Sequence, residues 1–351
     1  MLYIKGGGWC YNEQLCAGRA KTSLGSSVGL ASTFAFGGVS SDDPAVNPLM
    51  ASWNHVVLWY CDGASFSGDK TEPYHYPQTN QTLYFRGKRN LDAMIQTLIE
   101  DHGLNKAEEV LLSGGSAGGL STYLHADYVG TKLPRTVKKY KAAPNSGFFS
   151  LHATAAGEMQ YPDEMKYVYS MQNSTNGVNA HCKEAMAGSG EEWKCIFANF
   201  SYAHSTTKMF PLQSGTDSWQ MGNIWEGDKG CIGSKLVNCT AEEIADLNSY
   251  SESLVQDYKR TDKWGSPGEG GFVESCLEHV AAQGTAFDRY AIDGVKEVDA
   301  FTSWWLSDGT DPASKHQYLP CSFNVQPPHQ CNPSCGMGVE EGCAPDDLLC
   351  Q

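Results

Sequence analysis

Long apolar runs are missing from this chain of 351 residues, and so are internal repeats, low-complexity tracts and Pro- or Ser-rich linkers. A membrane-spanning helix needs roughly 18 or more consecutive apolar residues, so we expect no membrane span. Strand and helix patterns alternate without a linker, which favours a single domain over residues 1–351. With 41% hydrophobic residues, the chain has enough apolar side chain for a sizeable core.

Basic side chains are in deficit. The chain has 25 Lys and Arg against 40 Asp and Glu, which gives a formal net charge of −15. Nucleic acids and anionic membrane surfaces select basic patches, so we expect neither as a partner. The same charge argues weakly against a general affinity for polyanions.

Cysteine, by contrast, is abundant, with 13 residues. None of the Cys/His spacings makes a compelling zinc site, so we expect an oxidising compartment and roughly four to six disulfides. Because 13 is odd, at least one thiol has no partner within this chain. Sequence cannot fix the pairing, but short loops make three local bridges candidates: Cys10/Cys16, Cys182/Cys195 and Cys231/Cys239.

The most informative stretch runs from Val110 to Gly119 and reads VLLSGGSAGG. Its apolar start suits a strand in a sheet covered on both faces, and residues 120–129 have helical apolar spacing. Gly114, Ser116 and Gly118 fit G-x-S-x-G, the nucleophile elbow, in which small neighbours permit a strained turn that exposes the serine. An ordinary glycine-rich turn between a strand and a helix is the alternative.

A nucleophilic serine needs backbone N–H groups that stabilise the oxyanion, and losing one such donor costs about 3 kcal/mol of barrier. In hydrolases with this elbow, one donor follows the serine, here Ala117, and another lies on a glycine-rich loop after an earlier strand. Residues 2–5 have a strand pattern and lead into Gly6-Gly7-Gly8-Trp9-Cys10. A flexible turn is the alternative for this loop, and Trp9 either lines the acyl site or packs in the core.

The serine also needs a histidine base and an orienting carboxylate, in the chain order Ser, Asp or Glu, His. Such residues lie on loops at the carboxyl edge of the sheet. Residues 208–213 predict a strand followed by a loop with Asp217, and residues 271–276 predict a strand followed by His279. The rivals are His316 and His329 for the base, and Asp228 and Asp246 for the carboxylate.

These stretches resemble the pectin acetylesterase/Notum family of secreted serine carboxylesterases, and matching blocks run almost from end to end. The Tyr-Cys-Asp-Gly block at residues 60–63 and the Asp-Ser-Trp-Gln block at residues 217–220 are most similar to the plant pectin acetylesterase branch. The matching blocks are residues 6–10, 24–27, 60–69, 85–87, 113–120, 146–149, 217–220 with Asn223, 274–276 with His279, and 331–335.

The resemblance implies an α/β-hydrolase-like sheet with helices on both faces and a disulfide-bonded insertion. It implies that Ser116 is the nucleophile, Asp217 the orienting acid and His279 the general base. It also places Gly7, Gly8 and Ala117 at the oxyanion hole, with Trp9 beside it as a candidate for the substrate pocket. The resemblance further implies that Cys331 forms a disulfide, with Cys335 or Cys321 as its partner.

Two positions and one segment depart from the family pattern. Gly115 precedes the nucleophile where plant members carry Cys and Notum carries Thr, and Asn145 stands where the family has Asp. The segment from about residue 161 to 200 matches poorly, which predicts a cap insertion that diverges with the substrate.

The start of the chain lacks a secretion signal, because Met1 leads directly into a strand pattern. Family members carry a signal peptide and further strands before the glycine-rich loop, so we expect this chain to be truncated at its N-terminus. An extracellular or cell-wall location is therefore inferred from the cysteines and the family. Four N-glycosylation sequons fit that location, at Asn80, Asn173, Asn199 and Asn238.

The sequence thus predicts a monomeric serine carboxylesterase that hydrolyses O-acetyl esters of a cell-wall or extracellular polysaccharide such as pectin. It would need no metal or organic cofactor. One alternative is a Notum-like enzyme that removes a longer acyl chain from a protein or glycolipid. Another is a non-catalytic secreted binding protein on the same scaffold. The depth of the acyl pocket separates the two enzymes, and the sequence does not reveal it.

Overall fold

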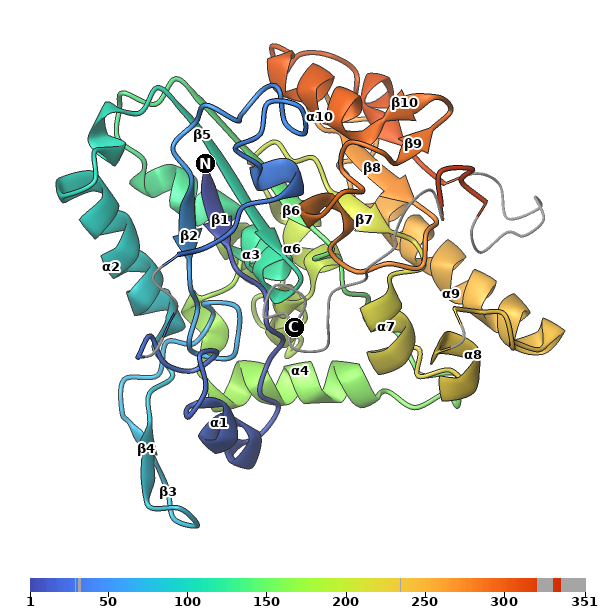
Figure 1. The fold of residues 1–351 in the computed structure, drawn as a ribbon. Coiled ribbons are helices and arrows are strands. Elements are labelled where there is room, and N and C mark those ends of the chain that lie inside the picture. Colours follow the sequence, from blue (N-terminus) through green and yellow to red (C-terminus); the bar gives the residue numbers. More distant parts are fainter. Residues whose placement is uncertain (29, 31–32, 234, 321–330, 336–351) are drawn as a thin grey trace.

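The computed structural model describes residues 1–28, 30, 33–233, 235–320 and 331–335. Its centre is a seven-stranded sheet in the order β11-β8-β7-β6-β5-β1-β2, with every neighbouring pair parallel (Figure 1). The strands are β1 (Leu2–Ile4), β2 (Val56–Leu58), β5 (Glu109–Gly115), β6 (Lys139–Asn145), β7 (Leu212–Ser214), β8 (Gly271–Glu274) and β11 (Gln317–Tyr318). Two small hairpins, β3 (Tyr74–Tyr76) with β4 (Gln81–Leu83) and β9 (Ala291–Ile292) with β10 (Val295–Lys296), stand outside this sheet.

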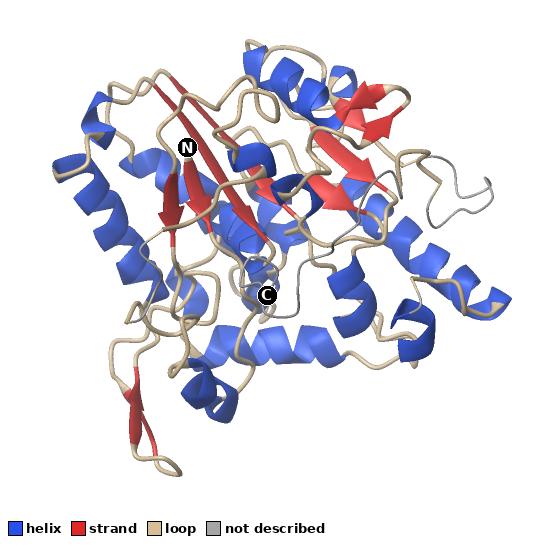
Figure 2. Ribbon diagram, viewed as in Figure 1, coloured by secondary structure: helices blue, strands red, loops and turns tan. Residues whose placement is uncertain are grey.

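Helices lie around the sheet in Figure 2, as the sequence predicted for a parallel sheet. The α-helices among the described residues are α1 (Glu13–Arg19), α2 (Gly87–Glu100), α3 (Ala117–Lys132), α4 (Gln160–Met171), α5 (Ala180–Ala185), α6 (Ala198–His204), α7 (Ser218–Asn223), α8 (Lys229–Gly233), α9 (Ala241–Arg260) and α10 (Glu297–Leu306). None of them is both long enough and apolar enough to cross a bilayer.

Two apolar clusters cover the two faces of the sheet. Side chains alternate along a strand, so Leu2 and Ile4 of β1 join the larger cluster and Tyr3 joins the other. Helices α2, α3, α4 and α9 contribute to the larger cluster, whereas α10 packs on the opposite face through Phe301 and Trp304. The prediction of an α/β sheet with helices on both faces is confirmed.

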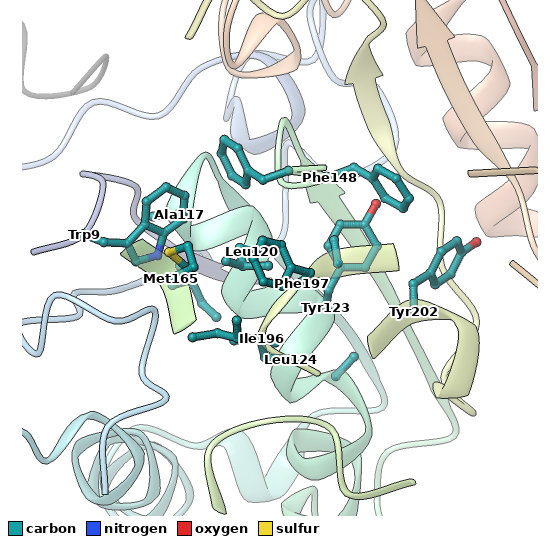
Figure 3. Packing of buried hydrophobic residues seen from close by; sticks show 14 of the residues in the cluster. Trp9, Ala117, Leu120, Tyr123, Leu124, Phe148, Met165, Ile196, Phe197 and Tyr202 are labelled. Carbon is teal, nitrogen blue, oxygen red and sulfur yellow. The ribbon is translucent and has the colours of Figure 1, made fainter. Parts of the chain in front are cut away.

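The segment between β6 and β7 includes residues 161–200, for which the sequence predicts a cap insertion. It forms α4, α5 and α6, and the Cys182–Cys195 disulfide joins α5 to the turn before α6. Figure 3 shows Met165 and Phe197 of this segment beside Leu120 of α3, all in one buried cluster. This segment is therefore anchored in the main core, and its identity as a cap insertion stays a prediction.

The predicted strand over residues 208–213 is displaced toward its C-terminal end. Ladder pairing with β8 begins only at Leu212, and Met209 makes an isolated bridge to Ala142. Pro211 lies between them, and proline has no N–H to donate to a ladder.

Disulfide pairing matches the sequence prediction at three of four places. Cys10–Cys16, Cys182–Cys195 and Cys231–Cys239 are all bonded. The pairing of Cys331 with Cys335 is wrong, because Cys335 is bonded to Cys276, 59 residues earlier. Cys331 is itself in a disulfide, and Cys321 lies outside the described residues. Cys61 is the free cysteine in the described part of the chain.

Glycine is required at the corner between β5 and α3, because backbones meet there. A Cβ on Gly118 would lie 2.1 Å from the carbonyl oxygen of Ile4 in β1. A Cβ on Gly114 would lie 2.4 Å from the carbonyl oxygen of Gly118. Neither neighbour is a side chain that could move aside, so β1, β5 and α3 pack this closely only with both glycines present.

We expect Gly118→Ala to destabilise the protein by several kcal/mol or to prevent folding, because the added methyl group overlaps backbone atoms. Gly222→Ala is the matched control, since Gly222 is also helical and a Cβ there meets nothing within 4 Å. Chemical unfolding of both variants tests this. Equal stability of the two variants would contradict the close packing.

Candidate active site

Ser116 has the backbone conformation of a nucleophile elbow. It joins β5 to α3 with φ 57° and ψ −126°, a strained region for a residue with a side chain. Its N–H donates to the carbonyl of Asn145 at 3.0 Å, which fixes the turn against β6. The next residue, Ala117, is the first of α3, where the N–H has no acceptor within the helix.

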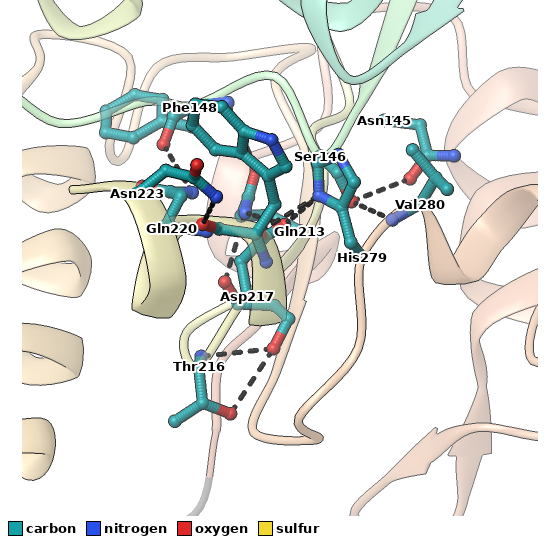
Figure 4. A network of polar contacts seen from close by, with 12 residues as sticks. Asn145, Ser146, Phe148, Gln213, Thr216, Asp217, Gln220, Asn223, His279 and Val280 are labelled. Atoms are coloured by element: carbon teal, nitrogen blue, oxygen red, sulfur yellow. Dashed lines mark hydrogen bonds and ion pairs between the residues drawn. The ribbon is translucent and has the colours of Figure 1, made fainter. Parts of the chain in front are cut away.

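Asp217 and His279 form a buried pair at the carboxyl ends of β7 and β8. The Nδ1 atom of His279 lies 2.8 Å from Oδ2 and 2.9 Å from Oδ1 of Asp217 (Figure 4). Asp217 is fully buried and caps α7, where Oδ1 accepts hydrogen bonds from the N–H groups of Trp219 and Gln220. The carboxylate is therefore fixed from two sides, and it orients the imidazole.

The residues next to Ser116 and His279 in the sequence, Gly115 and Val280, lie close together. A Cβ on Gly115 would lie 3.3 Å from Cγ1 of Val280, and the N–H of Val280 donates to Oγ of Ser146 at 2.8 Å. Within the described residues, Nε2 of His279 is buried and has no hydrogen-bond partner, Ser116 included. The contact between Ser116 and His279 therefore stays a prediction.

The rival residues from the sequence lie elsewhere. His316 precedes β11 and its carbonyl accepts from Gly271 at the start of β8, which is the sheet edge opposite His279. Asp228 bonds the N–H of Cys231 at the start of α8, and Asp246 is exposed on α9. His329 lies outside the described residues.

An aromatic wall of Trp9, Phe149, Tyr161 and Trp219 stands beside the Asp–His pair. The ring of Trp9 lies 4.9 Å from Phe149, 5.6 Å from Trp219 and 5.8 Å from Tyr161, measured between centroids. Phe149 and Trp219 lie 6.3 and 6.2 Å from the imidazole of His279. The sequence predicted Trp9 as a candidate for the substrate pocket, and Phe149 and Trp219 lie in blocks that match the family.

Trp9 has a fixed ring position. Its Nε1 donates to Oγ of Ser65 at 2.8 Å, and that hydroxyl donates to the carbonyl of Ala117 at 2.7 Å. The tryptophan of the glycine-rich loop is thereby linked to the residue after Ser116. Its contacts place it both in the core and at the site, so the two alternatives for Trp9 are not exclusive.

Two glutamines that sequence reasoning missed connect Phe148, the residue before Phe149 of the wall, to Asp217. Gln213 accepts the N–H of Phe148 at 3.1 Å and donates to Oδ2 of Asp217 at 3.5 Å. Gln220 donates to the carbonyl of Phe148 at 3.2 Å (Figure 4). Their strand and helix positions were predictable, but only the folded chain reveals that both reach residue 148.

Gly115 and Asn145, the two residues near Ser116 that depart from the family pattern, each have a distinct environment. A Cβ on Gly115 would lie 2.4 Å from the hydroxyl of Tyr3, so that hydroxyl occupies the space of a side chain. Asn145 is buried, its Oδ1 accepts from Oγ of Ser146, and its Nδ2 has no partner among the described residues.

Buried carboxyl groups gather behind the histidine loop. Burial raises the pKa of Glu274 and of Glu297 well above the ordinary value, and repulsion from Glu278 adds to both shifts. One oxygen of Glu274 accepts the N–H of Cys276, whereas its other oxygen has no partner among the described residues. Glu274, Cys276 and Cys335 lie close enough to hold a metal, but the two sulfurs are already joined in a disulfide.

We expect Glu297→Gln to stabilise the protein at neutral pH, by roughly 1 kcal/mol. With a raised pKa, the folded chain holds a proton that the unfolded chain loses above pH 4.5, so stability falls as pH rises from there. The variant and the parent should have equal unfolding midpoints at pH 4 and diverge by pH 8. Glu252→Gln on the exposed face of α9 is the control, and a gain at pH 4 equal to that at pH 8 would contradict the cause given.

The parallel sheet, the strained serine between β5 and α3, and the Asp–His pair beyond β7 and β8 define an α/β hydrolase-like protein. The chain belongs to the pectinacetylesterase family, which it matches over residues 1–335.

Relatives of known name come from two groups. The chain is 28% identical to pectin acetylesterase 5 of Arabidopsis thaliana, over 95% of this chain and 76% of that protein. It is 31% identical to pectin acetylesterase 4 of the same plant, over 80% and 67%. It is also 28% identical to the palmitoleoyl-protein carboxylesterase NOTUM of Schmidtea mediterranea, over 80% and 51%.

The structure of the Wnt deacylase Notum from Drosophila has a similar fold, with a TM-score of 0.74 over 95% of this chain and 89% of that one. The two sequences are 22% identical, so this likeness concerns the fold alone.

Proposed function

We propose that this chain is a serine carboxylesterase that removes O-acetyl groups from a cell-wall or extracellular polysaccharide. The observation that carries the proposal is the strained Ser116, which stands at the same sheet edge as the His279–Asp217 pair. The relatives named pectin acetylesterase support the substrate class. Four disulfides among the described residues support an oxidising, extracellular location.

In the proposed mechanism, His279 accepts the proton of Ser116 as its Oγ attacks the ester carbonyl. The unpartnered Nε2 of His279 is the atom available for that proton, because Nδ1 is bonded to Asp217. Asp217 holds the tautomer and stabilises the imidazolium that forms. Backbone N–H groups of the glycine-rich loop and of Ala117 stabilise the oxyanion.

The second half of the reaction reverses these roles. His279 returns its proton to the oxygen of the leaving sugar, which departs as an alcohol. The same histidine then takes a proton from a water molecule, which attacks the acetyl-enzyme and releases acetate. Ser116 recovers its proton from His279, so the enzyme ends the cycle unchanged.

We expect Ser116→Ala to lower kcat for p-nitrophenyl acetate by about 10⁴-fold or more. Ser121→Ala is the matched control, because Ser121 also lies on α3 and its buried hydroxyl has no partner among the described residues. Unchanged esterase activity in Ser116→Ala would refute the mechanism. An inactive parent protein that still binds acetylated pectin would support the non-catalytic alternative.

The aromatic wall supports a short acyl group. Each buried CH₂ of a hydrocarbon tail contributes about 0.8 kcal/mol, but only in a pocket that is open to receive it. Here the four rings of the wall pack against one another in T-shaped or tilted contacts. The hydrogen bond from Trp9 to Ser65 further restricts movement of one ring. We therefore expect the site to accept an acetyl group more readily than an octanoyl chain, which would have to displace these rings.

We expect kcat/KM to be at least tenfold higher for the acetyl than for the octanoyl p-nitrophenyl ester. Trp219→Ala should reduce that preference, because it removes the largest ring between Trp9 and His279. Trp264→Ala, at a partly exposed ring that contacts Tyr258, is the control. A parent protein that prefers the octanoyl ester would support the Notum-like alternative instead.

A further inference from the structure

The glycine-rich loop after β1 lies directly against the nucleophile. A Cβ on Gly6 would approach Cβ of Ser116 to 2.9 Å. Gly7 and Gly8 have φ of 141° and 60°, which side chains rarely permit. Glycine allows such a conformation but does not select it, because glycine is also the least restricted residue. Something else must hold the loop in the one geometry that suits an oxyanion.

Arg19 holds the first peptide of this loop. It is the last residue of α1, and its Nη1 donates to the carbonyl of Gly7 at 2.6 Å. Its Nε donates to the carbonyl of Leu24 at 3.1 Å, which fixes the guanidinium plane from a second side. The Cys10–Cys16 disulfide ties α1 to the end of the same loop. The arginine and the peptide that it contacts therefore belong to one covalently closed unit.

Tyr60 holds the next peptide. Its ring is buried, and its hydroxyl donates to the carbonyl of Gly8. The guanidinium of Arg19 lies over the Tyr60 ring, 5.2 Å from its centroid, so the two side chains also stabilise each other. Tyr60 follows β2 and packs against Phe66, which gives it an anchor independent of α1.

Two consecutive carbonyls are thus turned toward Arg19 and Tyr60. In a trans peptide, the N–H points away from the carbonyl of the same unit. The N–H groups of Gly8 and Trp9 therefore point to the opposite side of the loop. Neither amide donates a hydrogen bond to any residue in the described ranges. They are free to bind a ligand oxygen.

We propose that Arg19 and Tyr60 are positioning residues that clamp the oxyanion loop by its carbonyls and aim the Gly8 and Trp9 amides at the substrate. This inference rests on the proposed function, since it presumes an acyl transfer at Ser116. The charge of Arg19 also lies behind the polarised Gly7 carbonyl. It therefore favours the amides' interaction with a developing negative charge more than with a neutral ester.

Tyr60→Phe tests the clamp with the least disturbance, because it removes one hydroxyl and keeps the ring. Tyr123→Phe is the matched control, since the Tyr123 hydroxyl is buried and has no partner in the described part of the chain. We expect kcat for p-nitrophenyl acetate to fall about 10- to 100-fold in Tyr60→Phe with KM within twofold, somewhat less than the loss of a whole donor. Tyr123→Phe should keep the kcat of the parent.

A second readout separates positioning from general damage. In the complex with a methyl trifluoromethyl ketone, Oγ of Ser116 adds to the carbonyl carbon of the ketone. The carbonyl oxygen then carries a negative charge and occupies the oxyanion hole. The inhibition constant of the ketone should rise by the same factor as kcat falls in Tyr60→Phe, while both Tyr60→Phe and Tyr123→Phe stay fully folded at the assay temperature. Arg19→Lys should retain more activity than Arg19→Met, because lysine keeps a charged donor toward Gly7.

An unchanged kcat in Tyr60→Phe would overturn the clamp, and so would a fall in kcat without weaker binding of the ketone. Both results are interpretable only while Ser116→Ala is inactive. If Ser116→Ala stays active, the proposed function fails instead, and the two failures are thereby distinguished.

Discussion

The site depends on the close contact of three backbones where β1, β5 and α3 meet. The carbonyl of Ile4 touches Gly118, and the carbonyl of Gly118 touches Gly114, at distances that exclude any side chain. This contact fixes where α3 begins, and hence the strained conformation of Ser116. It also fixes the end of β1, from which the glycine-rich loop continues. The proposed nucleophile and the proposed oxyanion loop are thereby positioned by one packing constraint, which involves backbone atoms almost exclusively.

Around that corner, the rest of the site is held by polar side chains that each form hydrogen bonds to two different segments. Asp217 caps α7 and orients His279, and the two glutamines join Asp217 to the loop that carries Phe149. Such shared bonds make the site rigid, because no member can move without loss of a bond elsewhere. Rigidity of this kind suits a small acyl group, for which an adaptable pocket has no use.

Local sequence patterns predicted the sheet, the turn at Ser116 and the loops that carry Asp217 and His279, because each depends on periodicity, glycine spacing or chain order. The choice of Asp217 and His279 over their rivals rested on the family resemblance. Local patterns failed where the outcome depends on distant pairing. Cys335 bonds Cys276 rather than Cys331, and no spacing rule could favour a partner 59 residues away over one four residues away. The contacts of Trp219 and Gln213 were missed for the same reason, since they join segments that only folding brings together. The late start of β7 was predictable from Pro211, because proline has no N–H to donate to the strand ladder.

The sequence separations of the disulfides also determine how early each bond can close during synthesis of the chain. Cys10–Cys16, Cys182–Cys195 and Cys231–Cys239 span 6, 13 and 8 residues, so each can close soon after its segment is made. Cys276–Cys335 spans 59 residues, and its first cysteine lies three residues before His279. The histidine loop is therefore the last part of the site to be locked covalently. A chain released before residue 335 would contain Ser116, Asp217 and His279, yet it would lack the disulfide that anchors the segment leading to His279.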